Sequence, residues 1–314
     1  MQVWANIDID KRISIYTNAV SGFNQVIPKS CLLSTEHRRD VHDRCLIMSV
    51  DRHVLSNYIS CKPNYWRTNT LKEASQNYKD KYFSLIYGDD TNTYNGIPTL
   101  SKIRILRQPQ DRVLTRFNYD RHWGCVDYVR NLRNLDGFSK KKALVHWRGS
   151  TTGSEQRNIA VTQYFDNSLC DIAFSVLCQG YKPEKPEHCK NEIQDFPQML
   201  ENKYLLSING NDKASDINWK LASDSLVFIS YPKYESWLME SMLEPWIHYI
   251  PLKYDYSDLI EKYKWAESNQ DKCVEIIKNA NLFIDSNFGD KEKEERIERA
   301  VFKYYYDNVN ITLE

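Results

Sequence analysis

The sequence predicts an α/β protein that is built on a parallel sheet and divided into two domains. Three observations support this fold class: short apolar runs that end in small or polar residues, helical stretches between these runs, and a length of 314 residues. Strands that alternate with helices are typical of a parallel sheet. Because the chain is longer than one ordinary core requires, we expect two domains of about 150 residues each.

Four apolar runs mark the expected strands, at residues 83–87, 143–147, 204–208 and 225–229. Each run is followed by turn residues, which is typical of a buried strand. In open α/β sheets, ligands bind at the carboxyl ends of the strands. We therefore expect the turns that follow these runs to gather at the functional site.

Helices are expected between and after the strands, at residues 156–165, 216–222, 234–243 and 256–266. A charged helix is expected at residues 290–308, with Ile297, Val301, Tyr304 and Tyr305 along one face. A polar stretch that contains Gly137 places the domain boundary near residue 140. The expected organisation is an N-terminal domain (1–140), a C-terminal domain (141–289) and a terminal segment (290–314) that packs back on the N-terminal domain.

Composition narrows the class of partner. Lys plus Arg and Asp plus Glu both total 42, so no positive surplus favours nucleic acid. The eight cysteines show no metal-ligand spacing and are typical of reduced thiols. The N-terminus carries acids where a secretory signal carries basic residues, and no run of about 18 apolar residues indicates a membrane span. We expect a cytoplasmic protein without a membrane span, and the sequence does not indicate an oligomeric state.

The first candidate binding motif is the turn from Arg148 to Gly153, which reads Arg-Gly-Ser-Thr-Thr-Gly. It follows an expected strand and precedes a helix, so that backbone N–H groups, hydroxyls and guanidinium groups could converge on a diphosphate. The candidate donor-binding residues here are Arg148, Gly149, Ser150, Thr151 and Arg157. By itself, such a turn is more often only a turn. It lacks the Gly-Lys-Ser/Thr ending of a P-loop.

A second turn, at residues 209–215, also lies between an expected strand and a helix. Its candidates are Asn209, Gly210, Asn211 and Ser215, although Asn and Ser are equally common as turn and N-cap residues. Two such turns in one α/β half favour nucleotide binding.

Two acids in the stretch 234–251 are candidates for the two hydroxyls of a ribose, which a carboxylate suits. Glu240 is the first choice, and Glu235 is the second, since it could also be a solvated surface charge.

Several of these stretches, in the same order, resemble glycosyltransferase family 90. The similar segments are residues 97–104, 121–122, 147–150, 202–211, 219–228, 235–240 and 243–249. The family includes capsule-associated xylosyltransferases, protein O-glucosyltransferases and lipopolysaccharide-A-type enzymes. The sequence Glu-Ser-Trp-Leu-Met-Glu at residues 235–240 favours the last branch. The resemblance covers about residues 83 to 266.

The resemblance implies a GT-B-type fold, in which two Rossmann-like domains face each other across a cleft. It also implies a UDP-sugar donor, inversion at the anomeric carbon, and no required metal or other cofactor. One departure concerns the Arg that some members carry soon after the second turn. This chain reads Ser215-Asp-Ile-Asn-Trp-Lys220, so the donor phosphate would rely on Arg157 or Lys220.

In an inverting transfer, one carboxylate removes the proton of the attacking hydroxyl. The family's base is an Asp after an N-terminal strand, which matches Asp89, with Asp90 in reserve; the alternative is that this pair only caps a loop. Lys102, Arg104, Arg121 and His122 could line the acceptor side or cleft wall. A lone His is more often structural than catalytic, which applies to His122 and His248.

The expected substrates are a UDP-sugar, with xylose or glucose left open, and a glycan or lipid-linked oligosaccharide acceptor. Two alternatives remain. A metal-dependent GT-A-type transferase would use an Asp-x-Asp pair, a sequence pattern that occurs at Asp8-Ile-Asp10. A sugar-nucleotide or glycan-binding protein would have kept the fold without turnover.

Overall fold

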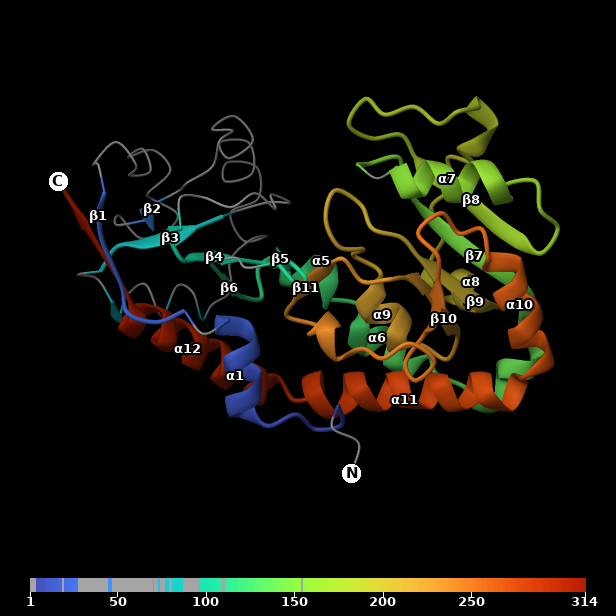
Figure 1. Cartoon of the computed structure of the whole chain (residues 1–314). Helices are drawn as coiled ribbons and strands as arrows, with labels where there is room; N and C mark the ends of the chain where they lie inside the picture. Colours follow the sequence, from blue (N-terminus) through green and yellow to red (C-terminus); the bar gives the residue numbers. More distant parts are fainter. Residues whose placement is uncertain are drawn as a thin grey trace. The chain divides into compact units, whose positions relative to one another are not determined.

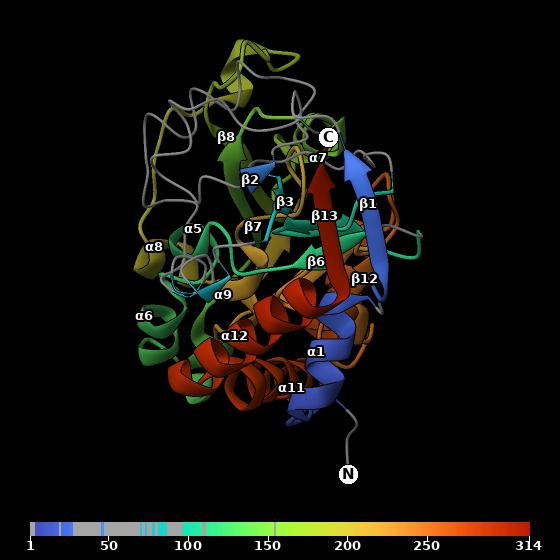
Figure 2. The same cartoon turned by 90° about the vertical axis from the view of Figure 1, so that its left-hand side faces the viewer.

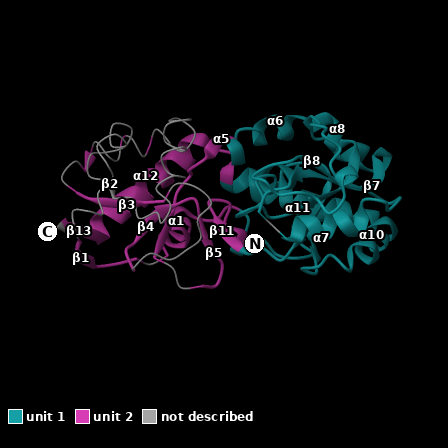
Figure 3. Ribbon diagram, turned by 90° about the horizontal axis from the view of Figure 1, so that it is seen from above, with its two compact units in different colours: residues 1–5, 121–233, 241–287 teal, residues 6–120, 234–240, 288–314 magenta. Residues whose placement is uncertain are grey.

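The structure is a computed structural model that describes residues 4–18, 20–27, 45–46, 70, 73, 77–78, 81–86, 96–108, 111–153 and 155–314. The chain forms two compact units, each assembled from three segments (Figure 3). Unit 1 contains residues 1–5, 121–233 and 241–287, and unit 2 contains residues 6–120, 234–240 and 288–314. Residues 121–140, which the sequence analysis places in the N-terminal domain, thus share a compact unit with residues 141–233.

Unit 1 is built on a parallel five-stranded sheet with the order β12-β10-β9-β7-β8. Its strands are β7 (Lys142–Ser150), β8 (Cys170–Val176), β9 (Asn202–Ser207), β10 (Leu226–Ser230) and β12 (Ile250–Leu252). Its helices are α6 (Val126–Asn131), α7 (Glu155–Tyr164), α8 (Phe196–Leu200), α9 (Ile217–Leu221), α10 (Leu259–Ser268) and α11 (Gln270–Phe288). Short 3-10 turns lie at Leu135–Lys140 and Pro186–His188, and α5 (Tyr119–His122) spans the junction of the two units in the chain. Figure 1 shows these helices around the sheet.

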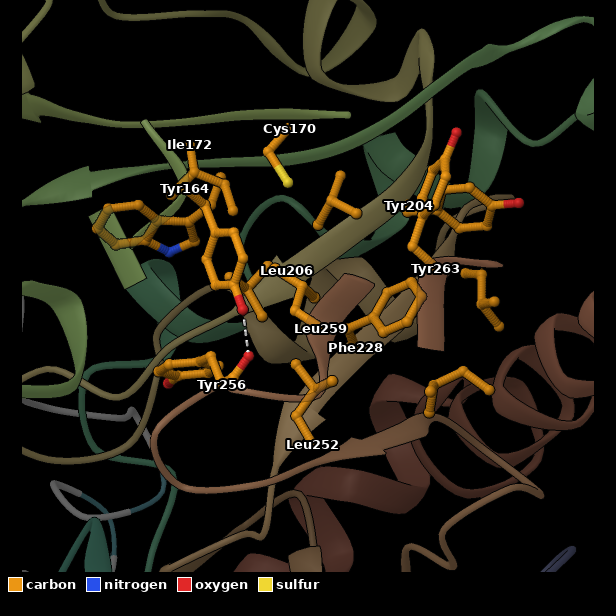
Figure 4. Packing of buried hydrophobic residues seen from close by; sticks show 14 of the residues in the cluster. Tyr164, Cys170, Ile172, Tyr204, Leu206, Phe228, Leu252, Tyr256, Leu259 and Tyr263 are labelled. Atoms are coloured by element: carbon orange, nitrogen blue, oxygen red, sulfur yellow. Dashed lines mark hydrogen bonds between the residues drawn. The ribbon is translucent and has the colours of Figure 1, made fainter. Parts of the chain in front are cut away.

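One face of this sheet packs against a large apolar core. Side chains alternate along β7, so that Val145 and Trp147 enter the core. Residues from α7, α10 and α11 complete it, and Tyr164 of α7 donates a 2.5 Å hydrogen bond to the carbonyl oxygen of Tyr256 (Figure 4). The bond keeps the phenol group of Tyr164 paired inside an apolar environment, where an unpaired hydroxyl would be costly.

The alternation along β7 gives the other face of the sheet a polar character. His146 and Arg148 both contact Asp171 of β8 there. The short helices α8 and α9 contact β9, and α9 also contacts β10. Unit 1 is therefore a parallel sheet with helices on both faces, the α/β class that the sequence predicts.

Unit 2 contains a four-stranded parallel sheet and two strand pairs. The sheet has the order β2-β3-β4-β6, from β2 (Cys45–Leu46), β3 (Phe83–Leu85), β4 (Thr99–Ser101) and β6 (Arg112–Leu114). An antiparallel pair joins β5 (Ile103–Ile105) to β11 (Tyr234–Ser236). A parallel pair joins β1 (Phe23–Ile27) to β13 (Val309–Leu313), and the two strands lie side by side in Figure 2.

Helices α1 (Ile9–Thr17) and α12 (Lys291–Asn308) pack on each other in unit 2. Their contact contains a buried ion pair in which Arg12 Nη1 lies 2.5 Å from Glu294 Oε1. Both helices begin at an aspartate: Asp8 accepts a hydrogen bond from the Lys11 N–H, and Asp290 accepts one from the Lys293 N–H. The N-cap role of Asp8 gives the Asp8-Ile-Asp10 sequence a structural use at the start of α1.

Most expected elements are confirmed. The four expected strands correspond to β3, β7, β9 and β10, and four of the five expected helices correspond to α7, α9, α10 and α12. The helix expected at residues 234–243 is wrong. That segment forms strand β11 and a 3-10 turn at Glu240–Met242, because its first residues pair with β5 and Met239 adopts a positive φ of 58°. Among the described residues, no helix is both long and apolar enough to cross a membrane.

Candidate functional site

Two loops meet at the carboxyl edge of the sheet in unit 1. One follows β7 and contains Gly153, and the other follows β9 and contains Asn211. Gly153 has a φ of 64°, and a Cβ built on it would lie 1.7 Å from Oδ1 of Asn211 and 2.8 Å from its Cα. Only glycine permits this close approach of the loops. The structure thus brings together the two turns that the sequence analysis singles out.

Arg157 of α7 ties these two loops together. Its Nε donates to the Asn209 carbonyl oxygen at 3.0 Å, and its Nη1 donates to the Ser150 carbonyl oxygen at 2.9 Å. Nη1 also donates to Oγ1 of Thr152 at 2.8 Å and to Oγ of Ser150 at 3.2 Å. The planar guanidinium, with five donors in a fixed fork, suits this bridging role.

The positive charge of Arg157 is held by neutral oxygens. Each of its hydrogen bonds within the described part of the chain goes to a carbonyl or hydroxyl group, and the residue is 9% exposed. Burial lowers the pKa of Arg157, and Arg121 acts in the same direction, whereas Asp216 and Asp212 raise it. A buried cation without a contacting carboxylate favours an anion at this edge of the sheet.

Hydroxyl and amide groups hold the rest of the two loops. Oγ1 of Thr151 accepts a 2.9 Å hydrogen bond from the Cys178 N–H and lies 3.1 Å from the Tyr181 carbonyl oxygen. Oδ1 of Asn209 accepts from the Ala214 N–H at 3.2 Å, so this side chain shapes its own turn. Ser215 is half-buried at the start of the turn that leads into α9.

Arg148 and Lys220 are each held by a carboxylate of unit 1. Nη2 of Arg148 lies 2.6 Å from Oδ1 of Asp171, which also binds Lys190. Burial raises the pKa of Asp171, but hydrogen bonds from His146, Lys190 and Arg148 bring the pKa well below its usual range.

Lys220 Nζ binds Asp216 and the Leu206 carbonyl oxygen, both at 2.6 Å, and burial lowers its pKa. Gly149 also has a packing role. A Cβ built on it would lie 2.4 Å from Cζ2 of Trp147, which leaves no space for a larger residue.

Four candidate residues, Lys102, Arg104, Glu235 and Glu240, belong to unit 2. Arg104 and Glu235 are paired positions of β5 and β11. Burial lowers the pKa of Arg104, while Glu235 and Glu240 raise it. Glu240 accepts hydrogen bonds from the backbone N–H and the hydroxyl of Ser236 at 2.6 and 2.7 Å. The structure therefore places these acids in a different compact unit from the Arg157 loops.

Arg121 and His122 lie in unit 1 on α5, with Arg121 exposed and His122 buried. Arg121 is close enough to Arg157 to contribute to its pKa. Asp89 and Asp90 lie outside the residues that the structure describes. Their assignment as base and reserve stays a prediction.

Sequence reasoning missed three residues that organise unit 1. Thr152 accepts a hydrogen bond from Arg157, and its place in the Ser-Thr-Thr run was the available signal. Gln156 is buried on α7 and donates to Oγ of Ser230, at the end of β10, at 3.0 Å. Asp171 fixes Arg148, but no local pattern marks it, because the two residues meet only when β7 and β8 pair. In the described ranges, no group of three His, Cys, Asp or Glu side chains is arranged to hold a metal ion.

Comparison with known proteins places these features in a family. The model described as Glycosyl transferase family 90 matches residues 121–304. The chain is 31% identical to O-glucosyltransferase LpsA of Dichelobacter nodosus over 229 residues, which cover 72% of this chain and 67% of the relative. It is 34% identical to human Protein O-glucosyltransferase 3 over 143 residues, 45% of this chain and 28% of that protein. It is 27% identical to Protein O-glucosyltransferase 2 of Danio rerio over 54% of this chain and 32% of that protein. The matched region includes both loops that Arg157 joins.

Proposed function

Because this chain belongs to glycosyl transferase family 90, we propose that it transfers glucose or xylose from a UDP-sugar to a hydroxyl of a glycan acceptor. The proposal includes a GT-B-type arrangement and a nucleotide bound by unit 1. The names of two relatives, O-glucosyltransferase LpsA and Protein O-glucosyltransferase 3, favour glucose. Since the two sugars differ by one hydroxymethyl group, a fitted pocket would separate them by only about 1–3 kcal/mol.

The observation that carries this proposal is the bridging position of Arg157. Its guanidinium is buried among neutral oxygens where the loops after β7 and β9 meet. A diphosphate leaving group gains negative charge as the sugar departs, and a preorganised cation stabilises that charge. The backbone N–H of Asn211 belongs to the same loops and could donate to a phosphate oxygen, whereas the Gly210 N–H donates to the Asp212 carbonyl oxygen at 3.0 Å.

In the proposed reaction, Asp89 removes the proton of the acceptor hydroxyl while this oxygen attacks the anomeric carbon. The bond from this carbon to the diphosphate breaks on the opposite side, which inverts the configuration and releases UDP. One base and one anion site suffice, so no metal ion is part of the proposal. Transfer that stops in EDTA and returns with a divalent cation would contradict this part.

The proposed acceptor is a glycan or a lipid-linked oligosaccharide, and the proposed location is the cytoplasm. A protein that binds the same ligands without turnover is the alternative. An assay of UDP release with a panel of donors separates the two, because a pure binder releases none.

The donor is tested by thermal shift with UDP, GDP and their glucose and xylose conjugates. A ligand that binds only the folded state raises the melting temperature. We expect uridine nucleotides to raise the melting temperature. Arg157→Lys should reduce this rise, and the control Arg299→Lys, at an exposed position of α12, should leave it intact. A larger rise with GDP, or an equal rise in Arg157→Lys, would overturn the proposed donor site.

A further inference from the structure

A cavity lies at the amino-terminal edge of the sheet in unit 1, opposite the Arg157 loops. Its volume is about 500 Å³, within the range of small-molecule sites. It is formed where β7, β9 and β10 begin, and its walls include Leu132, Lys140, Lys142, Pro197, Leu200 and Glu201. The Arg157 loops follow the other ends of β7 and β9, so the two sites are separate.

The floor of this cavity is a fixed ion pair. Lys141 Nζ donates to Asp224 Oδ1 and to the Leu200 carbonyl oxygen, both at 2.6 Å, and to Oγ of Ser225 at 2.9 Å. The other oxygen of Asp224 accepts a 2.9 Å hydrogen bond from the Asn134 N–H. All three ammonium donors of Lys141 are engaged. The charges of Lys141 and Asp224 therefore cancel.

The rim carries a second pair that a ligand can open. Lys142 and Glu201 lie 2.6 Å apart, but their side chains are 61% and 54% exposed. An exposed pair of this kind contributes only about 0–1 kcal/mol. The hydroxyls of a ligand can therefore replace the contact between these two side chains at little cost in free energy.

Lys140 supplies the uncompensated charge. It is exposed at the end of a 3-10 turn, and its side chain makes no hydrogen bond or ion pair within the described residues. Three lysines and two carboxylates line the cavity, so one positive charge remains. Leu132, Pro197 and Leu200 add apolar wall on which a ring can pack.

We propose that this cavity binds a hydroxyl-bearing organic molecule with one anionic group, such as a uronic acid or a sugar monophosphate. Lys140 pairs with the anionic group, the Lys142 and Glu201 side chains bind hydroxyls, and the apolar wall covers one face of the ring. The site is independent of the proposed donor site and does not require that the chain be a transferase.

The proposal is tested by calorimetric titration of the full chain with glucose 1-phosphate and with glucuronate, in the presence and absence of UDP. We expect both ligands to bind with UDP present, and to bind more tightly than inorganic phosphate or glucose. Lys140→Glu should weaken binding at least about tenfold, whereas Lys278→Glu, the same change at an exposed position of α11, should not. Leu132→Trp, which fills the cavity, should also abolish binding.

Three results would overturn the proposal: competition by UDP, equal affinity in wild type and Lys140→Glu, or no binding of either anion at millimolar concentration. Competition by UDP would place the anion at the UDP site, and the other two results say nothing about UDP binding. Failure here therefore leaves the proposed function untouched.

Discussion

A β-carbon on Gly210 would lie 2.9 Å from Nη2 of Arg157, so a larger residue does not fit beside this guanidinium. We predict that Gly210→Ala displaces the guanidinium and weakens UDP binding about tenfold. Because the displaced atom lies at the far end of a flexible side chain, the free energy of unfolding should change by less than about 1 kcal/mol. Calorimetric titration with UDP and urea denaturation measure the two effects.

The matched control is Gly137→Ala. Its β-carbon would also meet the end of a side chain, Nδ2 of Asn134 at 3.0 Å, but at the other edge of the sheet. UDP affinity should stay at the wild-type value there. Equal affinities in all three proteins would show that Arg157 is not part of the donor site.

Gly153→Ala should destabilise unit 1 by a steric clash as well as by backbone strain. Its Cβ would lie 2.8 Å from the Asn211 Cα, which cannot rotate away. Gly180 has a similar φ of 73° with nothing within 4 Å, so Gly180→Ala measures the strain alone, about 1–2 kcal/mol. Urea denaturation should show a larger loss for Gly153→Ala, and equal losses would exclude the clash.

Glu294→Gln should strongly destabilise unit 2. Glu294 binds the buried Arg12 and accepts a 2.6 Å hydrogen bond from Nε1 of Trp237. Removing one partner of a buried ion pair costs about 3–5 kcal/mol, because the other charge is left without compensation. Glu275→Gln breaks the exposed Lys272–Glu275 pair and should cost less than about 0.5 kcal/mol. A similar effect of the two changes in thermal denaturation would contradict this prediction.

His248 should make stability depend on pH. Burial lowers its pKa from 6.5 to about 4, and its Nδ1 accepts a 2.9 Å hydrogen bond from the Glu244 N–H. Above pH 6.5, neither the folded nor the unfolded state holds the proton. Between pH 6.5 and about 4, only the unfolded state takes it up, so the free energy of unfolding falls as the pH falls. One pKa unit is worth about 1.36 kcal/mol, so the loss can reach roughly 3 kcal/mol.

His248→Asn is the variant that tests this dependence. Its amide oxygen can accept from the Glu244 N–H as Nδ1 of His248 does, but it does not titrate. Urea denaturation at several pH values should show a shallower decline for the variant. Parallel declines would assign the pH dependence to other groups.

Asp89→Asn should abolish transfer while UDP still binds, because the amide cannot remove the acceptor proton. Asp90→Asn is the control, with the same change one residue further along. Release of UDP in the presence of acceptor measures turnover. Near-normal turnover by Asp89→Asn, or loss of turnover only in Asp90→Asn, would remove Asp89 from the mechanism.

The sequence predicts the sheet of unit 1 well because its signals are local. β7, β9 and β10 are short apolar runs, and each is followed by turn residues. The helix expected at 234–243 fails for the opposite reason. Its first residues pair with β5, more than a hundred positions earlier, and such a partner leaves no trace in the local pattern.

The same distinction applies to the candidate site. Arg157 is recognisable because it stands one helical turn after a small-residue loop, and the structure joins it to that loop. Arg148 is the first residue of the motif, yet Asp171 on the neighbouring strand holds it. The contact of Lys220 with Asp216 could have been predicted, since Asp216 stands four residues before it, the spacing of an ion pair within a helix.

The pairing of β1 with β13 has a consequence for synthesis. Phe23 pairs with Val309, so this strand pair cannot form until residues 309–313 have left the ribosome. Unit 1 has all of its segments once residue 287 has emerged, whereas unit 2 still lacks α12 and β13. Domains generally fold during translation as their segments become complete. The nascent chain should therefore complete unit 1 first and expose the apolar side chains of unit 2 to chaperones for longer.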